Sequence, residues 1–330
     1  MELRKDPITR SWVIIAEEDG YEIPRDPCPL CPGNEALTPQ TIFSLPPGSP
    51  NWQVRAVPHF HPLYRVEGDP ERHGDGIYDV MRAVGAHEII IETPDHNQSL
   101  SHAPQAAIER VLEAYVHRIV DLKRDIRFKY VTIFKNHGAL AGEELPHPHS
   151  QLTATTFVPR RVLYELRSSR EYFHLKERCV FCDIIHQEER QAHRVVEVQP
   201  NYIALCPFAA RVPFETWILP RHHHCAFEND LLHSNSPGEL AQLFARTLQR
   251  LEHVSDAYHM VLHTAPNTRS KTEIPEYWKT VADDYHWHIE ILPIAEKRIK
   301  SYSIKENYYN AVRPEEAAER LRAVPVEVLA

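Results

Sequence analysis

Four of the six cysteines in the sequence form two Cys-x-x-Cys pairs, Cys28–Cys31 and Cys179–Cys182, whereas Cys206 and Cys225 stand alone. The first residues, MELRKDPITR, lack the apolar core of an export signal, so structural disulfides are disfavoured. Two thiolates at this spacing can bind one tetrahedral ion, for which zinc is the usual metal. We therefore expect a zinc site at each pair, with one zinc shared by all four thiolates as the alternative.

The segment His147-Pro-His-Ser-Gln151 combines two imidazoles with a carboxamide. Residues two apart on a strand face the same way, so His147, His149 and Gln151 are expected on one face. If His147 binds a metal, His149 stands beside it and is free to react. Neutral imidazole attacks phosphorus near pH 7 when its other nitrogen is held by an acceptor. Gln151, helped by Asn136, can then donate to a phosphoryl oxygen as charge builds there.

An alternative remains open for this segment: both histidines could serve only as metal ligands, and the segment would then contain no nucleophile.

The position of this segment in the sheet is indicated by Pro148, which has no N–H to donate to a sheet ladder. We therefore expect the stretch to lie at a sheet edge, where a ligand can approach.

The elements that position these residues recur in two similar halves. In the first half, the apolar run 87–94 predicts a strand that is followed by His96, and 106–123 has its apolar residues at helical spacing. A strand is expected over 130–134, and a β-prone run over 152–157 follows the His-x-His segment.

The second half repeats this order. A strand over 216–220 runs into His222–His224, a helix is expected over 237–254, and strands follow over 259–263 and 286–292. Each half thus shows a Cys-x-x-Cys pair, a strand followed by His, a helix, a strand, and a strand that opens with His-x-His. The repeat predicts an α+β fold of two duplicated units with antiparallel sheets and packed helices.

The repeat also predicts the metal ligands, because each cysteine pair needs two more donors and each half supplies two histidines at equivalent places. We place the units at residues 1–175 and 176–330. The predicted ligands are Cys28, Cys31, His96 and His147 at one site, and Cys179, Cys182, His223 and His286 at the other. His222 or His224 can replace His223. Two zinc ions per chain are therefore expected.

The composition limits the class of protein. A chain of 330 residues with 42% hydrophobic and 25% charged residues fits two globular domains. The net charge of −9 disfavours nucleic acid as a partner. No apolar run is long enough to span a membrane, so a cytoplasmic location is expected. Only 10 glycines are present, without a Gly-rich phosphate loop, whereas 22 histidines are available to act on phosphate.

The string Phe134-Lys-Asn-His-Gly138 followed by His147-Pro-His-Ser-Gln151 resembles the active site of the galactose-1-phosphate uridylyltransferase family, a branch of the histidine-triad superfamily. Segments 85–94 and 314–321 are similar to the same family. The resemblance implies histidine-triad-like units and ping-pong nucleotidyl transfer. His149 would attack the α-phosphorus of UDP-glucose, release glucose 1-phosphate and pass the nucleotide to a second sugar phosphate or to phosphate. Gln151 matches the family's stabilising glutamine.

The resemblance implies two rival ligand sets for the second metal. The pair Cys179–Cys182 is similar to the ADP-glucose phosphorylase branch. Other relatives use one Glu and three His, which correspond here to Glu165, His263, His286 and His288. Both sets require His286, and we favour the cysteine set because thiolates hold zinc more tightly.

The resemblance implies a homodimer, and the expected substrate-binding residues are Asn136, Ser150, His59 and Phe60. Departures from the family concern phosphate recognition: the acidic segment 17–24 lies where relatives have arginines, Glu144 replaces a serine, His59 replaces an asparagine, and 304–308 lacks a glycine. Nucleotide-sugar phosphorolysis or hydrolysis, or nucleotide binding without turnover, therefore remain as alternatives to hexose 1-phosphate exchange.

Overall fold

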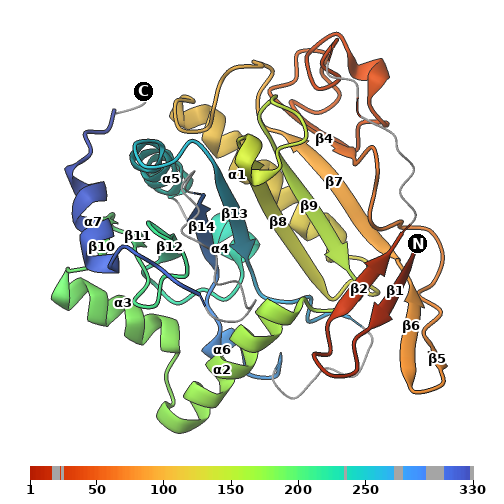
Figure 1. The fold of residues 1–330 in the computed structure, drawn as a ribbon. Coiled ribbons are helices and arrows are strands. Elements are labelled where there is room, and N and C mark those ends of the chain that lie inside the picture. The colour runs from red at the N-terminus through yellow and green to blue at the C-terminus, as the bar shows by residue number, and fades with distance from the viewer. Residues whose placement is uncertain (17–22, 24–25, 234–235, 271–277, 295–307, 328–330) are drawn as a thin grey trace.

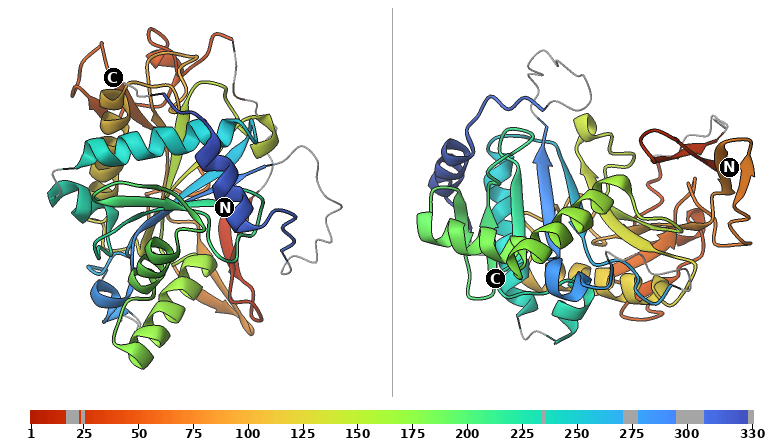
Figure 2. Two further views of the ribbon diagram at one scale, coloured as in Figure 1. Left: turned by 90° about the vertical axis from the view of Figure 1, so that its left-hand side faces the viewer. Right: turned by 90° about the horizontal axis from the view of Figure 1, so that it is seen from below.

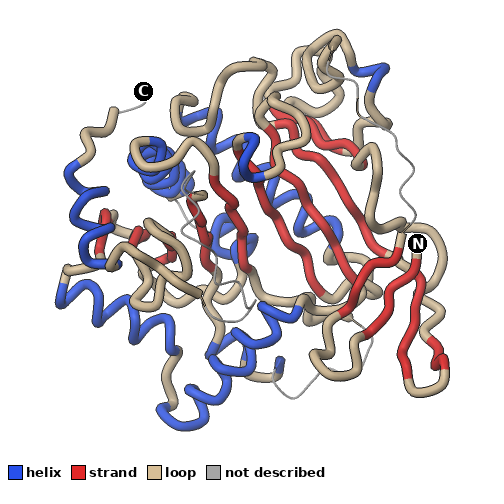
Figure 3. Tube along the Cα trace, viewed as in Figure 1, coloured by secondary structure: helices blue, strands red, loops and turns tan. Residues whose placement is uncertain are grey.

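The computed structural model describes all residues except 17–22, 24–25, 234–235, 271–277, 295–307 and 328–330. Its centre is a ten-stranded antiparallel sheet with the order β10-β11-β12-β14-β13-β8-β9-β7-β4-β3, and a separate four-stranded sheet has the order β2-β1-β6-β5 (Figure 1). Figure 3 shows helices on both sides of the large sheet, so the predicted α+β class is confirmed.

The strands of the large sheet are β3 (Phe43–Leu45), β4 (Val54–Pro58), β7 (Gly85–Ile91), β8 (Tyr130–His137), β9 (His149–Thr155), β10 (Val195–Val198), β11 (Tyr202–Leu205), β12 (Thr216–Pro220), β13 (Tyr258–His263) and β14 (His288–Pro293). The small sheet contains β1 (Glu2–Lys5), β2 (Trp12–Ile15), β5 (His73–Asp75) and β6 (Tyr78–Arg82). The α-helices are α1 (Gln105–Leu122), α2 (Arg160–Lys176), α3 (Val180–Gln191), α4 (Phe227–His233), α5 (Pro237–Glu252), α6 (Val281–Asp284) and α7 (Pro314–Ala323), and the short 3-10 helices are η1 (Glu35–Leu37) and η2 (Ala139–Ala141).

The sheet order shows the predicted duplication. Reading outward from the central pair β8 and β13, the first half contributes β9, β7, β4 and β3, and the second half contributes β14, β12, β11 and β10 in the matching order. The helix before each central strand, α1 or α5, lies on the same face of the sheet, and the two helices contact each other (Figure 2). The two halves therefore share one sheet.

One hydrophobic core joins the halves. In α1, Ile108, Val111, Leu112, Tyr115 and Ile119 recur at helical spacing, and all are buried against the sheet together with the apolar face of α5. On the opposite face, α2, α3 and α6 cover the strands of the second half with a smaller core. The predicted boundary at 175/176 falls at the end of α2 and stays a prediction.

One expectation about the sheet is wrong. The strand that contains His149 and Gln151 is not at an edge, because β9 pairs with β7 on one side and with β8 on the other. Pro148 is compatible with this position because it precedes the first residue of β9 and needs no ladder hydrogen bond there. No helix in the described part of the chain is long and apolar enough to cross a membrane.

Candidate active site and metal clusters

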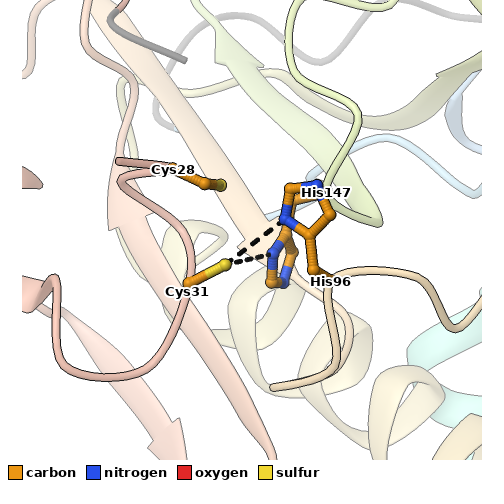
Figure 4. Close-up of side chains that lie close together, drawn as sticks. All are labelled: Cys28, Cys31, His96 and His147. Atoms are coloured by element: carbon orange, nitrogen blue, oxygen red, sulfur yellow. Dashed lines mark hydrogen bonds between the residues drawn. The ribbon is translucent and has the colours of Figure 1, made fainter. Parts of the chain in front are cut away.

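The first Cys-x-x-Cys pair lies next to the two histidines predicted from the repeat. Cys28, Cys31, His96 and His147 each offer one ligand atom, and these atoms lie within 4.8 Å of one another (Figure 4). The Cys31 sulfur is 3.3 Å from Nδ1 of His96 and 3.5 Å from Nδ1 of His147. Sulfur and nitrogen ligands of one tetrahedral zinc are about 3.6 Å apart, so this set fits zinc.

The second pair repeats this geometry. Cys179, Cys182, His223 and His286 also lie within 4.8 Å of one another, with the Cys182 sulfur 3.4 Å from Nδ1 of His223 and 3.8 Å from Nδ1 of His286. His147 and His286 each donate Nε2–H to a backbone carbonyl 2.8 Å away, which directs Nδ1 to the cysteines. The two pairs therefore form two separate clusters rather than one shared four-thiolate site.

A third cluster corrects the rival set for the second metal. Glu165, His263 and His288 do come together, but the fourth member is Glu290 and not His286, so the two sets do not compete. His286 lies two residues before β14 begins, so the alternation of side chains between the two faces of a strand does not determine its direction. Its ring faces the cysteines of the second cluster.

The third cluster is balanced by charges of its own. Arg211 donates to Glu290 at 2.6 Å, and Arg161 contacts both Glu165 at 2.8 Å and Glu290 at 3.3 Å. Burial would lower the pKa of His263, but the two carboxylates raise it to about 10. Glu165 and Glu290 therefore have cationic partners of their own in this cluster, unlike the donors of the two Cys/His clusters.

His149 is the first residue of β9 and is 4% exposed. Its Nδ1–H donates to the carbonyl of His147 at 2.7 Å, so the lone pair of the neutral ring lies on Nε2. Burial and the positive charge of Lys135 lower the pKa of His149 to about 4, so the ring is neutral at pH 7. The backbone of His147, a member of the first Cys/His cluster, thus orients the ring of His149.

A buried ion pair lies beside the backbone of His149. Lys135 and Glu92 are each 2% exposed and contact at 2.8 Å, and the Lys135 ammonium also donates to the His149 carbonyl at 2.9 Å. The predicted ligand-binding residue Ser150 belongs to this group, because its hydroxyl bonds to Glu92 and, at 2.5 Å, to Tyr115. This corrects the expectation for the Ser150 side chain, which faces the core and not the side of the sheet where His149 lies.

Gln151 lies on the same face as His149, two residues along β9. Its Oε1 is 3.0 Å from Nε2 of His87, whose ring stacks on His59 with centroids 4.0 Å apart. Nε2 of His59 lies 3.2 Å from a Glu144 carboxylate oxygen, and this interaction with His59 lowers the pKa of Glu144. The sequence analysis did not identify His87, because the register that places it two residues before Ile89, the strand neighbour of Gln151, is known only from the structure.

The remaining predicted residues lie around this face. Asn136 precedes the end of β8, and its Oδ1 is 2.9 Å from Nδ1 of His259 on the neighbouring strand. Phe60 lines a cavity of about 1290 Å³ together with Leu63 and Arg65. The acidic residues 17–22 and the segment 304–307 lie outside the described residues.

The second half holds a counterpart of His149 that is closed off. His288 also bonds through Nδ1 to the carbonyl two residues earlier, at 3.1 Å. Its ring stacks on His263 with centroids 4.6 Å apart, is flanked by Phe181 and Trp217, and is 1% exposed. Within the described part of the chain, His149 has no such aromatic enclosure.

Comparison with protein families covers nearly the whole chain. The N-terminal domain of galactose-1-phosphate uridyl transferase matches residues 11–159, and the C-terminal domain of the same family matches residues 165–329.

Relatives with two different named activities are similar to the chain. The chain is 29% identical to ADP-glucose phosphorylase of Arabidopsis thaliana, over 98% of this chain and 93% of the relative. It is 27% identical to galactose-1-phosphate uridylyltransferase of Thermotoga maritima, over 99% of this chain and 100% of the relative. A solved uridylyltransferase has a TM-score of 0.81 at 29% identity, with 98% of each chain covered. The Arabidopsis ADP-glucose phosphorylase with bound ADP-glucose has a TM-score of 0.77 at 28% identity, with 99% of this chain and 100% of that chain covered.

Proposed function

Since the chain belongs to the galactose-1-phosphate uridylyltransferase family, we propose that it is a nucleotidyltransferase that works through a nucleotidyl-His149 intermediate. The observation that carries this proposal is the bond from Nδ1–H of His149 to the His147 carbonyl at 2.7 Å, which leaves a neutral Nε2 beside Gln151. A histidine held in this way is a competent nucleophile toward phosphorus.

The reaction proceeds in two displacements. The Nε2 lone pair of His149 attacks the α-phosphorus of a nucleoside diphosphate sugar, the bond to the bridging oxygen breaks, and the sugar 1-phosphate leaves with the electron pair. A phosphate oxygen of the acceptor then attacks the same phosphorus, and the N–P bond breaks to return neutral His149. Gln151 donates N–H to a phosphoryl oxygen in both steps, where negative charge develops.

Residues around the nucleophile supply substrate contacts. Asn136 offers a second carboxamide on the face of His149, and Phe60 lines a cavity of about 1290 Å³ together with Leu63. We propose that the nucleotide lies against Phe60 and near His59. Glu144 lies with a carboxylate oxygen 3.2 Å from Nε2 of His59, so this side chain is directed at the imidazole near the proposed nucleotide position.

We propose zinc for both Cys/His clusters, because two thiolates and two imidazoles form the donor set in each. Zinc bound at the first cluster would join the segments that carry Cys28, Cys31, His96 and His147. Its function there is structural: with the His147 ring fixed, the His147 carbonyl holds the proton on Nδ1 of His149.

The proposed reaction is exchange between UDP-glucose and a hexose 1-phosphate. Phosphorolysis of ADP-glucose, with inorganic phosphate as acceptor, is the second candidate, and it is favoured by the similarity to the Arabidopsis phosphorylase. We further propose a cytoplasmic homodimer, for which light scattering should give twice the chain mass of 38.3 kDa.

The test is a half-reaction followed by a discharge. The metal-loaded protein is incubated with UDP-glucose or ADP-glucose, and intact mass should reveal a nucleotidyl adduct. Galactose 1-phosphate should discharge a uridylyl adduct, whereas discharge of an adenylyl adduct by phosphate would select the second candidate. If no nucleotide sugar forms an adduct, the transferase proposal fails and binding without turnover remains.

A further inference from the structure

We propose that His87 is a positioning residue for Gln151, which it holds so that the glutamine N–H₂ group faces the phosphoryl oxygens at His149. The inference deepens the proposed function and rests on it. The carbonyl oxygen and the N–H₂ group of the Gln151 carboxamide are nearly equal in size, so a neighbouring group must determine which of them faces the ligand.

The tautomer of His87 is fixed by the backbone. The Leu63 N–H donates to Nδ1 of His87 at 3.2 Å, so the ring proton lies on Nε2. Nε2–H therefore donates to Oε1 of Gln151 at 3.0 Å. Because the glutamine oxygen is engaged on the side of β7, the N–H₂ group points to the other side and remains available to a ligand.

The ring of His87 is itself held in place. His59 stacks on it with an interplanar angle of 5°, and a carboxylate oxygen of Glu144 lies 3.2 Å from Nε2 of His59. His87, His59 and Gln151 are 5%, 4% and 6% exposed, so water does not compete freely for their polar atoms. Burial also keeps His87 neutral by lowering its pKa to about 4.

The second half of the chain supports a coupled pair at these positions. In the first half, Gln151 lies opposite Ile89, and His87 is two residues before Ile89. In the second half, the counterpart of Gln151 is Glu290, which lies opposite Trp217. The counterpart of His87 is therefore Glu215, two residues before Trp217. There Arg211 bridges Glu215 and Glu290 at 2.6 Å each. The two positions are thus linked in both halves, directly between His87 and Gln151 and through Arg211 between Glu215 and Glu290. The second half has two carboxylates at these positions and therefore lacks the N–H donor that Gln151 provides in the first half.

The test compares His87→Leu with His87→Gln. Leucine removes the donor and lets the Gln151 amide rotate, so the rate constant for adduct formation in a single turnover should fall by about 100-fold. Glutamine keeps a donor at the same reach and should retain the rate within about 3-fold.

Binding of the nucleotide sugar is the first control. Its Kd, measured in a His149→Gly background, should change by less than about 3-fold in both variants, since the hydrogen bond from Gln151 to the phosphoryl oxygen acts in the transition state. His73→Leu, at an exposed position on β5, is the control for a histidine-to-leucine change.

A double-mutant cycle separates positioning from a general structural effect. In a Gln151→Ala background, His87→Leu should cause no further loss of rate. An equal loss in both backgrounds, or an unchanged rate for His87→Leu in the wild-type background, would overturn the inference.

Nitrogen NMR of the histidine rings provides a readout that does not need turnover. His87 should show the Nε2–H tautomer, and its Nε2 resonance should shift in Gln151→Ala. An Nδ1–H tautomer contradicts the positioning inference, even if the protein forms its adduct. A protein with the expected tautomer but without an adduct refutes the proposed function alone.

Discussion

The site depends on what surrounds each residue more than on residue type. His149 and His288 make the same Nδ1–H bond to the carbonyl two residues before them, at 2.7 and 3.1 Å. His288 is enclosed by Phe181, Trp217 and the stacked His263, whereas His149 lies at the end of a strand beside Gln151. The duplicated chain thus has two similarly bonded histidines in different surroundings, and this difference is the reason that we propose His149, and not His288, as the nucleophile.

Lys135 offers a residue-scale prediction about stability. Replacing it with methionine leaves the carboxylate of Glu92 buried without its cation, which should lower the free energy of unfolding by about 3–5 kcal/mol. Urea denaturation measures this change. The double variant Lys135→Met with Glu92→Gln should recover part of the loss, and no recovery would contradict the assignment of the loss to an unpaired charge.

His87 offers a prediction about pH. Its folded-state pKa of about 4 lies below the ordinary value of 6.5, through burial and the neighbouring His59, and Glu144 is the nearby carboxylate that opposes this shift. The unfolded chain therefore binds the proton first, and stability is lost as the pH falls from about 6.5 to about 4, by up to about 3 kcal/mol from this group. Denaturation curves across this range should show a shallower loss for His87→Gln than for the wild type. Parallel curves would contradict the prediction.

At the scale of elements, segments with an apolar pattern were predictable from the sequence, whereas short strands with exposed surfaces were not. The helix expected over 106–123 is α1 (Gln105–Leu122), and the strand expected over 216–220 is β12 (Thr216–Pro220). The small sheet was missed because its strands have only three to five residues and much of their surface is exposed, so no apolar alternation marks them.

The candidate site was predictable where the repeat constrained it. Both Cys/His clusters follow from equivalent places in two halves, but the role of Glu290 in the third cluster does not, because spacing cannot tell which way His286 faces before the strand begins. The pairing of His87 with Gln151 joins β7 to β9 and depends on strand register, which the sequence does not reveal.

The two cysteine pairs give a prediction about metal content. The intact chain should contain two zinc ions, and Cys28→Ser with Cys31→Ser should leave one and lower the melting temperature, because the loop then loses its link to His96 and His147. Plasma emission spectrometry counts the metal. The matched control is Cys225→Ser, outside both clusters, which should retain two. A third equivalent of zinc would indicate binding at Glu165, His263, His288 and Glu290.

At the scale of the whole molecule, the two halves form one structural unit. β8 and β13 pair at the centre of the sheet, and one buried cluster contains side chains from α1 and α5 together. Either half alone would expose the edge of its central strand and its part of the shared core. We therefore expect neither half to be stable alone, although the two halves repeat one plan.

This arrangement predicts cooperative unfolding. Calorimetry of the metal-loaded chain should show a single transition, and the separate chains 1–175 and 176–330 should each fail to give a cooperative transition. Mixing the two chains can restore the shared sheet. Independent cooperative folding of either chain would contradict the single unit.

We propose that His149, and not its counterpart His288, accepts the nucleotide. The most direct measurement is peptide mapping by mass spectrometry after the protein has been incubated with a nucleotide sugar and digested under conditions that preserve a phosphoramidate. We predict a nucleotidyl group on the peptide that contains His149, absent in His149→Gly. A nucleotidyl group on His288, or an adduct that persists in His149→Gly, would contradict the account.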